Sequence, residues 1–213
     1  MASRIVVDEI DVNTQTYINM KHNVHLSANL TSSDTNHNFK NNVIEQYWSV
    51  CDGSSRKLHN CTVTSQNVTT NMSLPNSYVD ITGSTITYTP PEGCIGVKYE
   101  FYFMLGWNDD HCISHWRFYL DNTEIIYARR SLSGRYMEQY EPLTWYIAIG
   151  GDTNWNTGRQ QTWNTPKTMK WQGRDYGSSN ERERVHLTQY WDGGGTDMFS
   201  APQIGITAYK AIA

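Results

Sequence analysis

The segment from residue 95 to residue 105 constrains the fold more than any other part of the sequence. Apolar or aromatic residues occupy every second position of it, namely Ile95, Val97, Tyr99, Phe101, Phe103 and Leu105. This period of two is typical of a β-strand and excludes an amphipathic helix. Tyr102 and Met104 make the other side of the segment partly apolar as well. We therefore expect a strand in the middle of a sheet, covered on both sides.

Further strand signals follow this pattern along the chain, separated by turn residues. Pro90 and Pro91, the pair Asp121-Asn122, and the pair Gly150-Gly151 mark the breaks between them. No segment of twelve or more residues has the period of a helix. The sequence thus predicts an all-β domain, a two-sheet antiparallel β-sandwich or jelly roll. The predicted strands, besides 95–105, are 61–70, 84–89, 111–120, 124–128, 143–149, 167–176 and 203–209.

The first part of the chain has a different character from the rest. Residues 1–42 are polar without a sustained period, and 27–42 is a Ser, Thr, Asn, Asp and His stretch. Such a segment buries too little apolar surface to fold alone, so we expect it either to stay mobile or to gain order against a neighbour. We expect an N-terminal attachment arm or linker at 1–42 and a β-domain at 43–213.

Composition excludes several classes of protein. The 213 residues contain no apolar run long enough for a transmembrane helix. The formal net charge of −4 argues against nucleic acid as a partner. Asp8 and Glu9 interrupt the first apolar residues, so no secretory signal is expected and the chain is assembled in a cytoplasm.

The four cysteines do not have the spacing of a zinc site. Cys51, Cys61, Cys94 and Cys112 form no CxxC pair. Buried free thiols are the expected state in a protein assembled in a cytoplasm, and a Cys51–Cys61 disulfide is the alternative.

No pattern in the sequence selects catalytic chemistry. The chain lacks GxSxG, HExxH and P-loop motifs. His111 and His115 would lie roughly 13 Å apart on one side of a strand, too far for one metal ion. No spacing selects a hydrolytic pair among the carboxylates Glu100, Asp109, Asp110 and Asp175. We expect no enzyme, no cofactor and no metal site.

Two aromatic segments suggest binding instead. Trp155 and Trp163 flank a polar stretch that contains Arg159, and Tyr190-Trp191-Asp192 precedes three glycines. Tryptophan and tyrosine rings stack on sugars, while Arg and Asp hydrogen-bond to sugar hydroxyls. The candidate glycan-contact residues are therefore Trp155, Arg159, Trp163, Tyr190, Trp191 and Asp192. The alternative is that these aromatics pack the ends of the domain or a subunit interface.

Several motifs together resemble a known group of proteins. They include Cys51-Asp-Gly-Ser, Asp80-Ile-Thr-Gly-Ser, His115-Trp-Arg-Phe-Tyr, Gly173-Arg-Asp-Tyr-Gly and Tyr190-Trp-Asp-Gly-Gly-Gly. The set resembles a C-terminal, tail-fibre-like domain of virion structural proteins from marine tailed phages and other aquatic viruses. The resemblance implies a TNF/C1q-like jelly roll on the virion surface, without membrane insertion.

The resemblance also implies partners. Heads of viral fibres often form homotrimers, and Tyr99, Phe101 and Phe103, or Tyr102 from the other side of the strand, are the candidate interface residues. The arm would bind other virion proteins, and the aromatic loops would bind host-surface glycans. We therefore expect a spike or tail-fibre head. The alternatives are a capsid decoration or minor capsid protein with a purely architectural role, and a cellular lectin or glycan-active enzyme.

Overall fold

A computed structural model describes residues 42–107, 112–134, 138–176, 183–188 and 198–211. The chain divides into two units, Met1–Asn38 and Phe39–Ala213, and every described residue belongs to the second unit. The described part contains no helix, and its sheets are antiparallel, which confirms the predicted all-β class. The predicted arm at 1–42 lies outside the described residues, except for Asn42, and stays a prediction.

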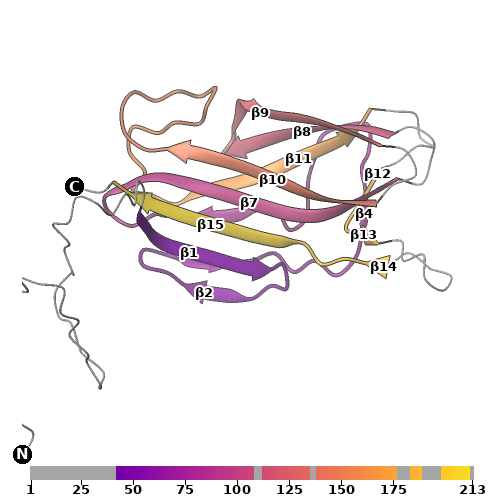
Figure 1. The fold of residues 1–213 in the computed structure, drawn as a ribbon, viewed down its shortest axis with the longest axis horizontal. Coiled ribbons are helices and arrows are strands. Elements are labelled where there is room, and N and C mark those ends of the chain that lie inside the picture. The colour runs from indigo at the N-terminus through magenta and orange to yellow at the C-terminus, as the bar shows by residue number, and fades with distance from the viewer. Residues whose placement is uncertain (1–41, 108–111, 135–137, 177–182, 189–197, 212–213) are drawn as a thin grey trace, which may run out of the picture. The chain divides into compact units, whose positions relative to one another are not determined.

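The first of two larger sheets has six strands (Figure 1). Across its width the order is β1–β15–β7–β10, with β7 paired along both edges. Strand β12 follows β15 along the same edge of β7 and pairs in turn with β4. The strands are β1 (Asn42–Val50), β4 (Met72–Ser73), β7 (Cys94–Trp107), β10 (Glu138–Ala148), β12 (Glu183–Val185) and β15 (Gln203–Lys210).

The second larger sheet has five strands. Strand β11 lies between β8 on one edge and both β5 and β6 on the other, and β9 pairs with β8. Its strands are β5 (Val79–Asp80), β6 (Ile86–Tyr88), β8 (Cys112–Leu120), β9 (Thr123–Gly134) and β11 (Lys167–Asp175). Two small ladders complete the structure: β2 (Ser55–Lys57) with β3 (Thr62–Thr64), and β13 (Leu187–Thr188) with β14 (Met198–Phe199).

The core lies where the inner sides of the two larger sheets meet. The ring of Tyr99 on β7 is 5.1 Å from that of Phe118 on β8, and Phe103 is equally close to Trp116. Because side chains alternate along a strand, β7 sends every second residue into this core. The predicted central strand at 95–105 is confirmed.

One set of candidate interface residues is corrected by this arrangement. Tyr99, Phe101 and Phe103 are fully buried within a single chain, so the prediction that they line a subunit interface is wrong. They are on the inner side of β7 and pack against the aromatic residues of the other sheet. Tyr102 is on the outer side, where its ring is 5.5 Å from Trp48.

The outer side of the first sheet carries aromatic rings, and we call it the aromatic face. The indole of Trp48 packs directly on Gly205, where a Cβ would lie only 2.7 Å from it. The hydroxyl end of the Tyr146 side chain lies over Gly96, where a Cβ would clash with it. The rings of the aromatic face belong to Trp48, Tyr102, Tyr140, Tyr146 and Tyr209.

The outer side of the second sheet carries charge, and we call it the charged face. Lys170 pairs with Asp80 at 2.8 Å, and Glu124 pairs with Arg129. Between these pairs, the guanidinium carbon of Arg117 lies 3.8 Å from the centre of the Tyr78 ring. The charged face consists of Tyr78, Asp80, His115, Arg117, Tyr119, Glu124, Arg129, Lys170, Arg174 and Tyr176.

The strands bring distant parts of the chain to two opposite ends of the domain. At one end, Asn42 pairs with Lys210, while Ala148 pairs with Gly96 (Figure 1). At the other end, Trp107 pairs with Glu183. The segment that joins β10 to β11 and carries Trp155 therefore begins at the end where the chain enters the domain.

Candidate functional site

The loop that carries Trp155 is fixed by its own hydrogen bonds. The side-chain oxygen of Asn154 accepts the backbone N–H groups of Asn156 at 3.0 Å and Thr157 at 3.3 Å. The backbone of Asn154 accepts the N–H of Gly158 at 2.8 Å and donates to the carbonyl of Arg159 at 3.1 Å. Asparagine forms such turns readily, and Gly158, with φ of +81°, takes a conformation that other residues avoid. The sequence Asn-Trp-Asn-Thr-Gly therefore forms a hydrogen-bonded turn that fixes the backbone at Trp155.

The loop is also fastened to the second sheet and to β10. Tyr127 on β9 donates its backbone N–H to the carbonyl of Asn156 at 3.0 Å. The indole N–H of Trp145 donates to the carbonyl of Thr157 at 2.9 Å. These contacts make the loop a rigid extension of the domain.

Two exposed aromatic side chains result from this geometry. Trp155 is 51% exposed and Tyr127 is 62% exposed, although both belong to well-anchored segments. Arg159, also exposed, makes no ion pair in the part of the chain that the structure describes. Exposed rings beside amide and guanidinium donors can stack on a sugar and hydrogen-bond to its hydroxyls. We call Trp155, Tyr127, Asn156 and Arg159 the Trp155 site.

Trp163 does not belong to the Trp155 site. It is only 5% exposed, and its indole N–H donates to the carbonyl of Tyr88 at 3.2 Å. The two rings pack edge to face with their centres 6.3 Å apart. The prediction that Trp163 faces outward is therefore wrong, because the chain turns back into the core before β11 begins.

The second predicted aromatic segment is not among the described residues. Tyr190, Trp191 and Asp192 lie outside them, between β13 and β14. Next to β13, His186 donates its backbone N–H to Met104 near the end of the domain opposite Ala148. The role of Tyr190, Trp191 and Asp192 as glycan contacts stays a prediction.

The candidates for other chemistry are dispersed. Glu100 lies on the outer side of the first sheet, bound to Lys98 at 2.7 Å, whereas Asp175 points into the core from the second sheet. His115 bonds to Ser131 at 3.0 Å. His111, Asp109 and Asp110 lie outside the described residues. Within the described ranges, no three His, Cys, Asp or Glu side chains converge on a point where a metal ion could bind.

Three of the cysteines are free thiols. Cys51, Cys61 and Cys94 are all free, which agrees with the expected thiols and rules out a Cys51–Cys61 bond in this structure. Burial, with a contribution from Asp52, raises the pKa of Cys51 to about 12. This thiol is therefore neutral at physiological pH and is a poor nucleophile.

No pattern in the sequence marks Tyr127 as a surface residue. Strand β9 buries Ile125 and Ala128, three positions apart, so a simple alternation does not assign a side to Ile126 and Tyr127. The register of β9 against β8 shifts at this point. A bulge that exposes two neighbouring apolar residues cannot be recognised from alternation along the sequence alone.

In the described residues, no helix has the length and apolar character needed to cross a bilayer. No protein-family model matches the chain, and it matches no curated protein. Function therefore has to be inferred from the residues themselves.

Proposed function

We propose that this chain is a virion structural protein, the head of a surface spike or tail fibre, that binds host-surface glycans. The observation that carries glycan binding is the exposed Trp155 on a loop fixed by hydrogen bonds, beside the exposed Tyr127. A ring carried on an ordered backbone loses less conformational entropy on stacking against a sugar than a ring on a disordered loop does. The virion assignment rests on the resemblance of the sequence motifs.

We propose that the two larger sheets form a TNF/C1q-like jelly roll. The pairings that support it are nested: β1 with β15, β6 with β11, β7 with β10, and β8 with β9. A chain whose first strand pairs with its last, and so on inward to adjacent strands, is a long hairpin wound into two sheets. That winding is what distinguishes a jelly roll from other two-sheet arrangements.

The aromatic face supports self-association, and the resemblance favours a homotrimer. Tyr140 and Tyr146 are each 46% exposed, and the rings of Tyr102 and Tyr140 stack with their centres 5.7 Å apart. Lys98 and Glu100 neutralise each other in the middle of this face. An apolar, neutral surface loses little favourable solvation when a second copy covers it. The arm at 1–42 would attach the trimer to other virion proteins.

The same aromatic face also favours the second candidate function. In a capsid decoration or minor capsid protein, it would pack against a neighbouring capsid subunit, and the role would be purely architectural. The two functions differ in whether Trp155 has a ligand.

Glycan binding by the purified full-length protein tests the proposal. We expect Trp155→Ala to abolish binding on an array of host-surface glycans and to reduce adsorption to host cells, with unchanged thermal unfolding. Phe199→Ala is the matched control, because it removes an exposed ring of β14 that belongs to neither the Trp155 site nor the aromatic face. Glycan binding that survives Trp155→Ala would reject the site, and a wild-type protein that binds no glycan would favour the architectural role.

A further inference from the structure

The charged face gathers cations around one tyrosine. The guanidinium carbons of Arg117 and Arg174 lie 3.8 Å and 5.4 Å from the centre of the Tyr78 ring. Cation–π contacts account for each arginine singly, but bringing two like charges to one ring has an electrostatic cost. From this geometry we propose that Arg117, Arg174 and the neighbouring Tyr176 bind the acidic group of a carboxylated or sulfated saccharide.

Within the described residues, too few carboxylates contact these arginines. Glu124 contacts Arg129 closely and lies 3.6 Å from Arg117, so one anion is shared between two cations. The other carboxylate of this face, Asp80, is held by Lys170 at 2.8 Å and by Gln172 at 2.7 Å.

Arg174 differs in its ion pairing from Arg117, Arg129 and Lys170, each of which contacts a carboxylate. In the described ranges it has no carboxylate partner, and its hydrogen bond is to the carbonyl of Asp175 at 3.5 Å. Burial lowers the pKa of His115, and the charges of Arg174 and Arg117 lower it further, as expected where positive potential is not neutralised. An arginine fork in such a place matches the geometry of a carboxylate or sulfate.

The neighbouring aromatic ring favours a sugar as the bearer of that acid. Tyr176 is 63% exposed, and its ring centre lies 5.8 Å from the guanidinium carbon of Arg174. A sugar ring stacked on Tyr176 would place its acidic substituent at Arg174. Nucleic acid offers the same pair of groups, and a saccharide is favoured here because the proposed function already assigns a sugar to the Trp155 site on the same side of the domain.

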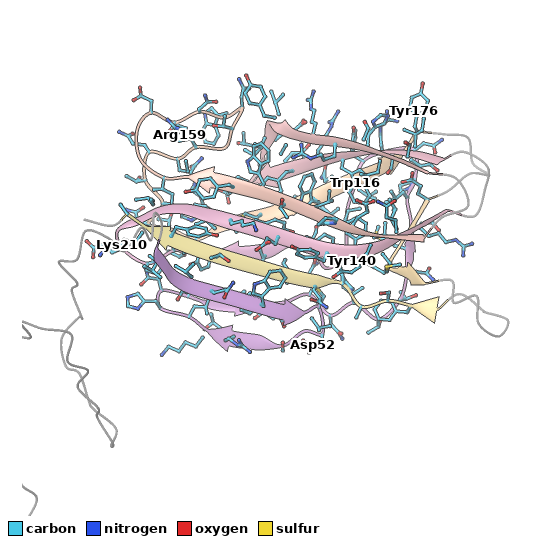
Figure 2. All side chains as sticks on the ribbon, viewed as in Figure 1. Asp52, Trp116, Tyr140, Arg159, Tyr176 and Lys210 are labelled. Carbon is cyan, nitrogen blue, oxygen red and sulfur yellow. The ribbon has the colours of Figure 1, made fainter. Side chains whose placement is uncertain are left out.

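This inference rests on the proposed function and defines its ligand more closely. Arg159 of the Trp155 site and Tyr176 lie toward opposite ends of the same side of the domain (Figure 2). Strand β9 connects the two sites: Ile125, two residues before Tyr127, pairs with Phe118, and Ser131 pairs with His115, three residues or about 10 Å away along β8. An extended acidic polysaccharide can therefore contact both sites at once.

Calorimetric titration of the full-length protein tests the inference. The probes are oligosaccharides of hyaluronan and chondroitin sulfate, neutral cello-oligosaccharides, and single-stranded DNA. We expect the acidic saccharides to bind more tightly than the neutral ones, and Arg174→Gln to weaken them about tenfold, the effect of losing one charge-assisted pair. Lys170→Gln is the matched control, since it removes the same charge from the same strand, and it should change affinity less than about twofold.

The other outcomes separate the two proposals. Equal losses from Arg174→Gln and Lys170→Gln would mean diffuse charge attraction and would overturn the site. DNA binding that depends on Arg174 would replace the saccharide with a nucleic acid. Neutral saccharides that bind through Trp155, without any gain from an acidic group, would reject this inference and leave the proposed function intact. A protein that binds none of the saccharides would reject both, and unchanged thermal unfolding of Arg174→Gln would exclude misfolding as the cause of a loss.

Discussion

The two outer faces of the domain grow from the same core but differ in chemistry. The aromatic face packs Tyr146 and Trp48 closely over Gly96 and Gly205, and Lys98 and Glu100 form an ion pair on it. The charged face carries arginines on tyrosine rings, and its described carboxylates, Asp80 and Glu124, are too few to balance its cations. The first face is suited to cover by protein, and the second to contact with water and anionic ligands. The difference shows that residues outside the core determine what each sheet contacts.

The strongest test of this comparison is the oligomeric state. We expect Tyr102→Glu to convert a trimer of the full-length protein into a monomer, because a carboxylate would be buried without a partner at the centre of the aromatic face. Light scattering measures the change directly. Tyr119→Glu introduces the same group on the charged face and should leave the mass unchanged. If both variants keep the wild-type mass, the aromatic face does not mediate self-association.

The two tryptophans of one loop sharpen the contrast between exposed and buried rings. Trp163→Ala should lower the free energy of unfolding by about 3–5 kcal/mol, because it leaves a cavity and an unsatisfied Tyr88 carbonyl. Trp155→Ala should change the free energy of unfolding by less than about 0.5 kcal/mol. Denaturant titration measures both. Equal destabilisation would contradict the assignment of Trp155 to a surface site.

Acid should weaken the packing between the two larger sheets, because it protonates His186. Its ring donates to the Thr82 carbonyl at 2.9 Å and packs against Phe101 and Phe103. Burial lowers the pKa of His186 from 6.5 to about 4, and the bond to Thr82 opposes this only in part. The unfolded chain therefore binds this proton more readily than the folded one, and stability falls as the pH drops from about 6.5 to about 4.

The expected loss over that range is about 3 kcal/mol. Urea titrations across the pH range measure it. His186→Asn should remove this part of the pH dependence, since Asn tolerates the positive φ of 64° at this position and does not titrate. A variant with the wild-type pH slope would show that other groups cause it.

The smallest expected effect concerns the close packing of the Trp48 indole on Gly205. In Gly205→Ala, the new Cβ would lie 2.7–2.9 Å from the Trp48 indole and displace it. We expect a cost of about 1–3 kcal/mol in the free energy of unfolding. In the background of Trp48→Ala the same change should cost almost nothing, which a double-mutant cycle measures. Equal costs in both backgrounds would mean that the indole is not the obstacle.

Local pattern was sufficient to predict much of the fold. Strand β7 and the burial of Trp116, Phe118 and Leu120 on β8 follow from alternation along each strand. Gly150 and Gly151 end the predicted strand at 143–149, and both have positive φ. By contrast, the predicted strand at 61–70 is reduced to Thr62–Thr64, because β-branched residues favour a strand only where a partner strand lies beside them.

The site was less predictable, because it depends on contacts between distant residues. The sequence marks Trp155 and Trp163 alike, and only the packing of Trp163 against Tyr88 separates them. A backbone hydrogen bond from Tyr127 to Asn156 brings Tyr127 near Trp155, and no spacing in the sequence predicts that bond. Arg117 and Arg174 belong to different strands and meet at Tyr78 only because β8, β11 and β5 are neighbours.

Under the proposed function, the position of Asn42 has a mechanical consequence. Asn42 and Ala148 mark the same end of the domain, and the Trp155 loop begins there. A head tethered by the residues that precede Asn42 would stand with Trp155 near its foot. A glycan would then have to pass between neighbouring heads to reach it. Crowding of heads on the particle, as well as intrinsic affinity, would set the speed of attachment.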